Sequence, residues 1–353
     1  MIHQFDRILE SFEAPTELIK GLPTPQKGVV SAAEGARYFL LSAQTNAAFV
    51  AVNRLLKNGI KVARLQKAMR VGARLWPTGS WVVYGEKDTV SALTELGVSF
   101  SGTTKRPSKA SLRPVQKLRI GLWDRYGGSM PSGWIRWLLE QHEFDFEVVL
   151  SKELGEGKLR EKFDALIFPP GAISSGARRS GNRRRRTQTR TGFGGQLKSF
   201  LENGGSVVTI GSSTALAKQL KLPIESALVT KDEDGEDRPL KQEEFFIPGS
   251  VVQVHVDNSE RAAWGAMVNT NVMFRRSPIF RITGKSRSIR PIAWFDTETP
   301  LRSGWAWGQE HLNGGVAMAV ASVGKGELFL FGPDVTYRAQ PHASFRFVFN
   351  TLY

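Results

Sequence analysis

Apolar and polar positions in the first third of the chain follow the periods of strands and of one helix. The stretches "ARYFLL", "IKVARLQ" and "GSWVVYG" are strand-like. Between the first two, "TNAAFVAVNRLLKNG" places Phe49, Val52 and Leu56 on one helical face, and Gly59 ends the helix. This pattern predicts a small β-α-β unit over residues 31–104. Such a unit is too small to cover both faces of its sheet, so we expect it to pack on a larger body.

A longer alternation of strands and helices begins at residue 118. The stretches "LRIGLW", "FDFEVVL", "DALIFPPG" and "SVVTIG" are typical of buried strands, and helical patterns separate them. The first helix, "SMPSGWIRWLLEQHE", has Trp134, Trp137 and Leu138 on one stripe. Strands that alternate with helices predict a parallel sheet covered on both faces, here in a domain of residues 118–353.

The alternation stops between residues 223 and 300. Stretches such as "EEFFIPGSVVQVHVDNS" and "RPIAWFD" look like strands and turns without helices, which predicts a β-rich insertion. Afterwards "GGVAMAVASVGKGELFLFG" predicts two strands about a turn, and a final helix has Phe345, Phe349 and Leu352 on one side. The predicted fold class is thus α/β, with a parallel sheet that carries a β-rich insertion.

Two stretches lack a regular pattern. Residues 1–30 have a short amphipathic start followed by prolines and glycines, and we interpret them as a connecting segment. Residues 105–117 are basic, contain proline and serine, and have the character of a linker. The chain is therefore predicted to hold two α/β units joined by a linker.

Composition excludes several classes of protein. Of the 353 residues 41% are hydrophobic, enough for a globular core, and no apolar run reaches the length of a membrane span. The N-terminus has no basic region followed by an apolar one, so we expect no secretory signal and, by default, a cytoplasmic location. Cysteine is absent, which excludes disulfides, thiolate nucleophiles and cysteine-ligated metals.

The net charge of +15 raises the question of nucleic acid. Much of it lies in a predicted Arg-rich loop, residues 170–192, where "ARRSGNRRRRTQTRTG" holds seven arginines and no acid. No aromatic residue interleaves with these arginines, so bases would have no platform on which to stack. We interpret the loop as solvated and disordered, with nucleic-acid binding as the alternative.

Candidate site residues come from the carboxyl ends of predicted strands, where open α/β sheets hold their ligands. Three strand ends matter: "GLWDRYGGSM", "TIGSSTA" and "LFGPDVTYRAQ". They supply the ligand-pocket candidates Asp124, Arg125, Ser129, Gly211, Ser212, Ser213, Asp334, Arg338 and Gln340.

Each candidate has a structural alternative. Ser213 lies where an elbow nucleophile would lie, but no histidine occupies the late-strand position of a base, so we favour the interpretation that Ser213 caps the following helix. Arg338 and Gln340 could hold a carboxylate or could tie the last turn to the edge of the sheet. No group of residues has the spacing of a metal site, so we expect no metal in this chain.

This layout resembles the class I glutamine amidotransferase fold, which implies a flavodoxin-like parallel sheet. In that family a cysteine on a sharp strand-to-helix turn is paired with a late His-Pro-Glu. Here the turn reads Gly211-Ser212-Ser213-Thr214-Ala215, and Gly332-Pro333-Asp334 takes the place of His-Pro-Glu. The resemblance therefore implies a retained scaffold whose catalytic residues are lost.

A longer set of segments resembles the C-terminal half of bacterial zinc carboxypeptidase-like proteins of the carboxypeptidase A class. The set runs in order from "RYFLLSAQTNAAFVAVNRLLKNGIKV" through "EEFFIPGSVVQVHVD" and "LRSGWAWG" to "VGKGELFLFGPDVTYRAQPHASFRFVFNTLY". None of the five histidines begins His-x-x-Glu, so the resemblance implies that zinc belongs to a peptidase domain absent from this chain. It also implies a metallopeptidase domain or subunit as partner, and the resembled proteins are typically exported.

Three functions follow from these observations. The first is a catalytically degenerate, amidotransferase-like accessory or interaction module of a metallocarboxypeptidase-type protein, which would bind a small ligand or peptide at the strand ends. The second is a serine-dependent hydrolase that uses Ser213. The third is nucleic-acid binding through the Arg-rich loop.

Overall fold

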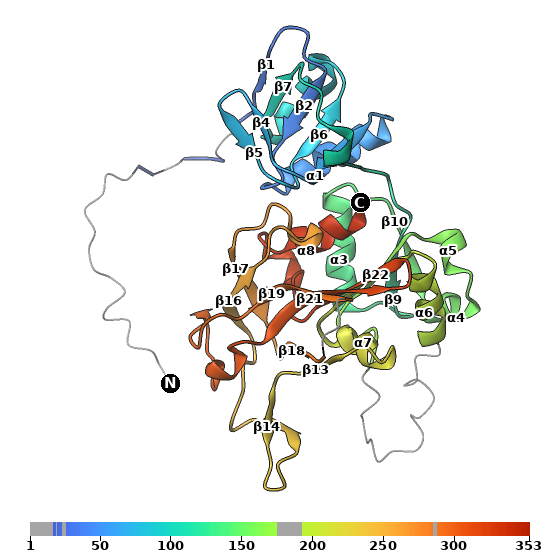
Figure 1. Ribbon diagram of the computed structural model, residues 1–353, viewed down its shortest axis with the longest axis vertical. Coiled ribbons are helices and arrows are strands. Elements are labelled where there is room, and N and C mark those ends of the chain that lie inside the picture. The colour runs from blue at the N-terminus through green and yellow to red at the C-terminus, as the bar shows by residue number, and fades with distance from the viewer. Residues whose placement is uncertain (1–16, 19, 23–25, 175–192, 285–287) are drawn as a thin grey trace.

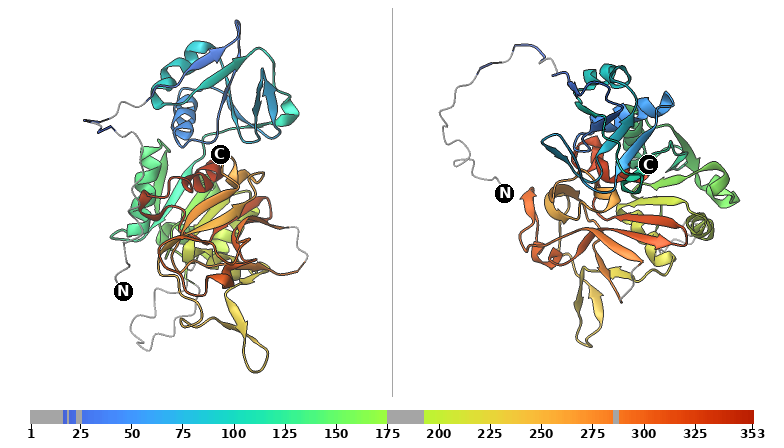
Figure 2. Two further views of the ribbon diagram at one scale, coloured as in Figure 1. Left: turned by 90° about the vertical axis from the view of Figure 1, so that its left-hand side faces the viewer. Right: turned by 45° about the horizontal axis from the view of Figure 1, so that its top comes forward.

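A computed structural model describes residues 17–18, 20–22, 26–174, 193–284 and 288–353 of the chain. The chain is an α/β protein with two main sheets, one in the N-terminal part and a larger one in the rest (Figure 1). The two parts lie against each other, with the last helix at their junction (Figure 2). No helix of the described ranges combines the length and the apolar character needed to cross a bilayer.

The first sheet contains the predicted β-α-β unit, but another strand lies between its two strands. Strands β2 and β3, which flank α1, do not pair with each other, because β6 lies between them and is antiparallel to both. Helix α1 buries the predicted face, including Phe49, Val52 and Leu55. In order across the sheet, the strands are β1 (Val30–Ala32), β7 (Phe100–Thr103), β2 (Tyr38–Leu41), β6 (Trp81–Tyr84), β3 (Val62–Leu65) and β8 (Leu112–Pro114). The other elements are α1 (Ala47–Lys57), α2 (Lys87–Ser91), the hairpin β4 (Met69–Val71) with β5 (Arg74–Trp76), and 3-10 helices at Ala92–Leu96 and Lys109–Ser111.

The predicted linker is wrong over its second half, because it includes an edge strand of the first sheet. β8 pairs antiparallel with β3, and Leu65 lies opposite Leu112. Pro114 is compatible with this position, since an edge strand leaves one row of backbone groups unpaired and tolerates a missing N–H. Three residues are too few to show a strand period in the sequence.

Five strands of the second sheet are parallel, as predicted. They are ordered β10 (Phe146–Leu150), β9 (Ile120–Asp124), β11 (Ala165–Phe168), β12 (Ser206–Ile210) and β22 (Gly326–Phe331). Each of β9, β11 and β12 is buried or nearly so along its length, which explains the continuous apolar runs in the sequence. This half of the sheet is covered by helices on both faces.

The predicted β-rich insertion is not a separate body, because its strands continue the same sheet. β21 and β22 are joined by a tight turn at Gly324 and pair antiparallel. Beyond β21, the strands β19, β16 and β17 extend the sheet by further antiparallel pairs. The strands are β21 (Val316–Val323), β19 (Ile289–Trp294), β16 (Ser250–Val256) and β17 (Asn269–Phe274), with β13 (Ile224–Ser226), β18 (Phe280–Ile282) and β20 (Leu301–Ser303) beside them. A separate hairpin pairs β14 (Val229–Lys231) with β15 (Asp237–Pro239), and 3-10 turns lie at Arg261–Ala263 and Gln309–Leu312.

Two layers of helices cover the parallel half. Helices α3 and α8 pack on one face, with Leu138 and Phe345 in one apolar cluster, and α4 to α7 pack on the other, with Leu154 and Leu197 in a second cluster. The helices are α3 (Met130–Gln141), α4 (Ser151–Glu156), α5 (Leu159–Lys162), α6 (Gly194–Glu202), α7 (Leu216–Gln219) and α8 (Phe345–Phe349). Three further 3-10 helices are Gly211–Ala215, Tyr337–Ala339 and Asn350–Leu352.

Only part of the apolar stripe predicted on α3 is buried in the fold. Leu138 is buried, but Trp134 is 37% exposed and Trp137 is 46% exposed. The buried face of the helix instead contains Ile135 and Leu139 beside Leu138. The two tryptophans therefore lie on the outer side of the helix.

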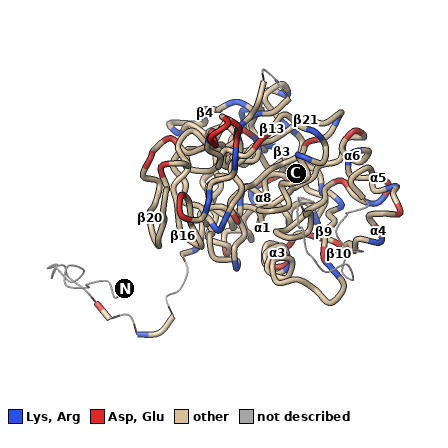
Figure 3. Tube along the Cα trace, turned by 90° about the horizontal axis from the view of Figure 1, so that it is seen from below, with Lys and Arg blue, Asp and Glu red and all other residues tan. Residues whose placement is uncertain are grey.

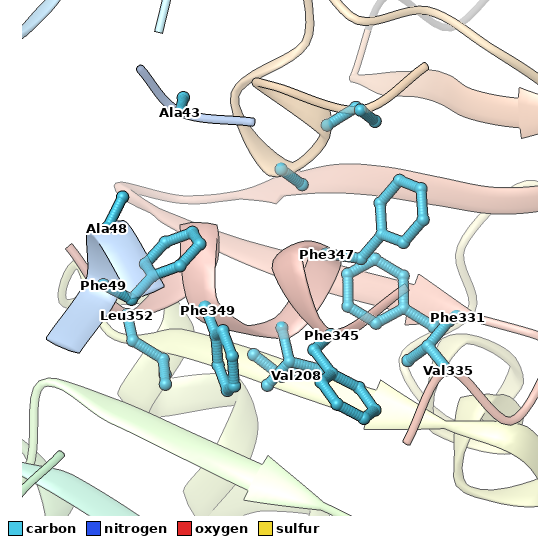
Figure 4. Close-up of a cluster of buried hydrophobic side chains, with 14 of the residues drawn as sticks. Ala43, Ala48, Phe49, Val208, Phe331, Val335, Phe345, Phe347, Phe349 and Leu352 are labelled. Atoms are coloured by element: carbon cyan, nitrogen blue, oxygen red, sulfur yellow. The ribbon is translucent and has the colours of Figure 1, made fainter. Parts of the chain in front are cut away.

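A single apolar core joins the two parts of the chain. The ring of Phe49 on α1 lies 5.2 Å from that of Phe349 on α8, measured between centroids. Figure 4 shows α8 between Phe49 and Val208, so the helix bridges α1 and the second sheet. Because the burial of α1 depends on α8, the N-terminal part is completed by the C-terminal residues.

Buried polar side chains also cross this junction. Arg346 of α8 donates hydrogen bonds to Ala43 O at 2.9 Å and Gln44 O at 2.8 Å in the N-terminal part. It also donates to Gly265 O at 2.6 Å and Ala343 O at 3.2 Å in the second part. Burial lowers the pKa of Arg346. The guanidinium thus bonds to four backbone carbonyls from three segments.

Arg64 of β3 is buried at the same junction. Its Nε donates to Gly79 O at 2.6 Å and its Nη1 to Asn350 Oδ1 at 3.1 Å. Its guanidinium stacks on Trp81, with Cζ 3.7 Å from the ring centroid. Burial lowers the pKa of Arg64 to about 9.

Candidate functional site

Four loops follow the carboxyl ends of parallel strands in the second sheet. They span residues 125–129, 169–174, 211–215 and 332–340, after β9, β11, β12 and β22. Ligands of open α/β sheets bind at this edge. Every candidate residue named from the sequence lies on one of these loops or at the end of β9, so the predicted positions can be compared directly.

Gly211 and Ser212 hold the loop after β12 against the loop after β11. Gly211 has φ +58, and a side chain there would have its Cβ 3.2 Å from Pro170 Cγ. Ser212 Oγ accepts a hydrogen bond from Gly171 N at 2.9 Å. The backbone conformation therefore favours glycine, and a side chain here would press closely on Pro170.

Ser213 is a second tie between the same two loops. Its hydroxyl donates to Pro169 O at 2.6 Å and accepts from Ile173 N at 3.1 Å, and the side chain is fully buried. The prediction that it caps the following helix is wrong, since Ser213 lies inside the 3-10 helix Gly211–Ala215 and the N-cap of the following helix, α7, is Ala215. Its hydroxyl bonds to backbone groups of the neighbouring loop instead.

The described histidines make their contacts elsewhere. His142 Nδ1 lies 2.9 Å from Leu138 O at the end of α3, and burial lowers the pKa of His142. His255 Nδ1 lies 3.2 Å from Asp296 Oδ2, and the ring of His342 packs on that of Phe345. Within the described ranges, no imidazole is hydrogen-bonded to the hydroxyl of Ser213.

The loop after β9 is closed by its own polar groups. Asp124 is buried, and its Oδ1 accepts from Arg125 N at 2.8 Å. Arg125 Nε donates to Gly128 O at 2.8 Å, and Ser129 is the N-cap of α3, with Oγ accepting from Ser132 N at 3.4 Å. These hydrogen bonds give the three candidates a structural role in ordering the loop.

Asp334 ties the turn after β22 to the end of β17. Its backbone N–H donates to Met273 O at 3.0 Å, and its Oδ1 accepts from Thr336 Oγ1 at 3.4 Å. Burial raises the pKa of Asp334, and the hydrogen bonds from Thr336 and the charge of Arg275 oppose that rise. The Asp334 carboxyl group is thus partly withdrawn from solvent.

Arg338 and Gln340 lie at the outer side of the same turn and are exposed. Arg338 has φ +47, and its Cζ lies 5.2 Å from the ring centroid of Tyr337. Gln340 N donates to Tyr337 O at 3.0 Å. Among the residues that the structure describes, no hydrogen bond from the Arg338 guanidinium ties it to the sheet.

The structure brings only part of the candidate set together. The serines after β12 meet the loop after β11, while the β9 loop and the β22 turn each form their own hydrogen bonds. Sequence reasoning missed Arg275, which lies close to Asp334 and Tyr337 although β17 is far from both in the sequence. No local signal in the sequence links these segments.

Two other kinds of site do not coincide with the candidates. Over the described ranges, no three His, Cys, Asp or Glu side chains cluster as metal ligands would. A surface depression of about 430 Å³ lies between α5 and α6, and its lining includes Arg160, Gln196 and Phe200 but none of the candidates. The arginines of residues 175–192, on which nucleic-acid binding was predicted, lie outside the described residues.

Replacing Ser213 by alanine is expected to lower the free energy of unfolding by about 2 kcal/mol, because a buried carbonyl and a buried N–H lose their partner. The matched control is Ser212→Ala, which loses one hydrogen bond at an exposed side chain and is expected to cost less than about 1 kcal/mol. Urea titration of both variants measures the difference. Equal losses at the two positions would contradict the tie described for Ser213.

Comparison with known proteins gives only remote structural likenesses. No protein-family model matches the chain, and no curated protein does. Among solved structures, it is similar to a β-galactosidase from Bacillus circulans sp. alkalophilus, with 10% identity and a TM-score of 0.36 over 65% of this chain. It is also similar to a ThuA-like protein from Bacteroides uniformis, with 9% identity and a TM-score of 0.36, over 71% of this chain and 94% of that one. A third similar structure is PurLQS from Thermotoga maritima, with 13% identity and a TM-score of 0.41, over 67% of this chain and 100% of that one. The chain spans 30% of the length of the β-galactosidase.

Proposed function

We propose that this chain is a non-hydrolytic interaction module built on a flavodoxin-like, class I glutamine amidotransferase-like sheet. The order of the parallel strands supports the finer fold assignment. Numbered along the chain, β10, β9, β11, β12 and β22 stand in the order 2-1-3-4-5 of flavodoxin-like sheets. The loops at their carboxyl ends are then the positions where such a module would meet a small ligand or a peptide.

The state of the Ser213 hydroxyl carries the proposal. An elbow nucleophile must present its oxygen to substrate and give its proton to a neighbouring base. Here the proton is directed to Pro169 O, and a lone pair accepts from Ile173 N, with the whole side chain buried. The chain has no cysteine that could act as the nucleophile instead. The hydroxyl therefore serves to join two loops.

A fluorophosphonate probe tests this proposal directly. We expect no labelling of the folded chain, while a serine hydrolase in the same mixture is labelled, because the buried hydroxyl has no activating base. The serine-hydrolase alternative predicts the opposite. Labelling of Ser213 that is abolished in a folded Ser213→Ala variant would overturn the proposal.

We further propose that the module belongs to a metallocarboxypeptidase-type protein, as an accessory domain or subunit. The support is the ordered set of sequence segments that resemble the C-terminal half of such proteins. Zinc and peptide cleavage would then belong to the peptidase partner. A reading frame next to this gene that encodes His-x-x-Glu and a distant histidine is expected, and a gene neighbourhood without one would count against the carboxypeptidase association alone.

A further inference from the structure

Arginine and aromatic side chains alternate on the surface beside the last turn of the chain. We call this surface the Arg-aromatic strip, formed by Trp305, Phe246, Arg276, Arg275, Tyr337 and Arg338. Arg276 Cζ lies 5.4 Å from the centroid of Phe246, which lies 6.0 Å from that of Trp305. On the other side, Arg275 Cζ lies 5.6 Å and Arg338 Cζ 5.2 Å from the centroid of Tyr337. The two groups of contacts meet at the turn that bears Arg275 and Arg276, which are adjacent in the chain.

The backbone is held in an unfavourable conformation where the strip is formed. Arg276 has φ +50, Arg338 has φ +47 and Ala339 has φ +53. Residues with a Cβ rarely adopt this left-handed region, and such residues concentrate at functional sites when the surrounding structure fixes them. Arg276 N donates to Ile247 O, which fixes this turn against the segment that bears Phe246. The two adjacent arginines are thereby directed to two different rings.

The three arginines of the strip lack the carboxylate partners that several other arginines of this protein have. Across the described chain, lysines and arginines are mixed with acids (Figure 3), and arginines such as Arg119, Arg238 and Arg281 form ion pairs with carboxylates. Arg275, Arg276 and Arg338 are exposed, and within the described residues none of them forms an ion pair of 4 Å or less. Three exposed arginines without an ion pair favour an anionic partner.

The rings decide which anion fits. Trp305 is 50% exposed, so part of its indole surface is available to a ligand. A single strand of nucleic acid combines evenly spaced phosphates with flat bases, and proteins bind it by basic side chains that follow the backbone and rings on which bases stack. Guanidinium groups bind phosphate oxygens in a bidentate manner. We propose that the Arg-aromatic strip binds single-stranded nucleic acid without sequence preference, with phosphates at the arginines and a base on Trp305.

This inference is independent of the proposed accessory role and of residues 177–192. That arginine segment contains no aromatic residue, whereas in the strip the two kinds of side chain come from four separate segments that only the fold brings together. The experiment must therefore separate the strip from the arginine segment and from the net charge of the chain.

The test is a fluorescence-polarisation titration of the full chain with a labelled oligothymidylate of about fifteen nucleotides, over a range of salt concentrations. Replacing Arg275, Arg276 and Arg338 together by alanine is expected to weaken binding about tenfold at ~100 mM salt. It is also expected to reduce the slope of log K against log salt by about 2. Replacing Trp305 by alanine is expected to weaken binding by about tenfold.

Matched controls remove the same chemistry from other surfaces. Replacing the exposed Arg70, Arg106 and Arg136 by alanine changes the net charge equally, and Trp134→Ala removes another exposed indole. Both controls are expected to change binding less than twofold. A chain that lacks Ser180–Thr191 is expected to retain sensitivity to the strip variants.

Several results would overturn the proposal. Equal losses in the two triple variants would mean that net charge alone attracts the oligonucleotide. Binding that disappears with Ser180–Thr191 and ignores the strip variants would assign it to the arginine segment. A sulfated oligosaccharide that binds more tightly than the oligonucleotide, with no effect of Trp305→Ala, would identify an anionic glycan site instead. Absence of binding to the oligothymidylate at low salt would exclude the proposal altogether.

Discussion

Replacing Arg346 by methionine is expected to lower the free energy of unfolding by about 3–5 kcal/mol, one of the largest effects available in this chain. The substitution keeps much of the side-chain volume but removes all donors. Carbonyls of Ala43, Gln44 and Gly265 would then be buried without their partner at the junction of the two parts. An unpaired buried polar group costs more than the bond itself contributes, so the losses accumulate.

Urea unfolding at a fixed pH measures this effect as a shift of the midpoint. Arg346→Lys retains the charge but offers a single ammonium group to carbonyls that a planar guanidinium now reaches together, so an intermediate loss is expected. Arg136→Met, on the exposed side of α3, is the matched control and should change stability by less than about 0.5 kcal/mol. A loss below about 1 kcal/mol in Arg346→Met would contradict the bridging role.

Replacing Gly265 by alanine is expected to cost about 3 kcal/mol or more, because two penalties act at one position. Gly265 has φ +79, and its added Cβ would lie 2.2 Å from Ala43 O and 2.7 Å from Ala43 C. Both neighbouring atoms belong to backbone, which cannot rotate away as the end of a long side chain can. The N-terminal part would have to move away from the second part, and this would also stretch the hydrogen bonds of Arg346.

Gly314 provides a control with almost the same backbone conformation. It has φ +76 and no neighbouring atom within 4 Å of the added Cβ, so Gly314→Ala isolates the conformational cost of about 1–2 kcal/mol. The difference between the two variants measures the close approach at the junction. Combining Gly265→Ala with Arg346→Met should cost less than the sum, since both changes break the same contact. Additive losses would show that the two residues act separately.

The sequence predicted those parts of the fold whose signal is local. Helices α1 and α6 have clear apolar faces followed by glycine, and strands β9, β11 and β12 are continuous apolar runs. Strand β8 was missed because three residues carry no period. The antiparallel continuation of the second sheet was missed because a strand pattern does not specify its partner.

The sequence predicted which loops carry the candidate residues, but not the contacts that these residues make. The loops after β9, β12 and β22 do lie at the carboxyl edge, as parallel topology requires. The sequence could not specify that the Ser213 hydroxyl bonds to Pro169 O and Ile173 N, because that depends on the packing of two loops. Nor could it bring Phe246 and Arg276 together, since only the turn at Arg276 makes that contact.

The position of α8 has a consequence for the order in which the protein is made. The strands of the first sheet are complete once residue 114 has left the ribosome, yet Phe49 and Trp81 are covered by rings from residues 349 and 353. Until those residues are synthesised, the nascent N-terminal part lacks the side chains that cover this apolar surface in the folded protein. Domains normally mature in the order of their translation. We therefore expect the first sheet to reach its final packing only after residues 349 and 353 have been synthesised.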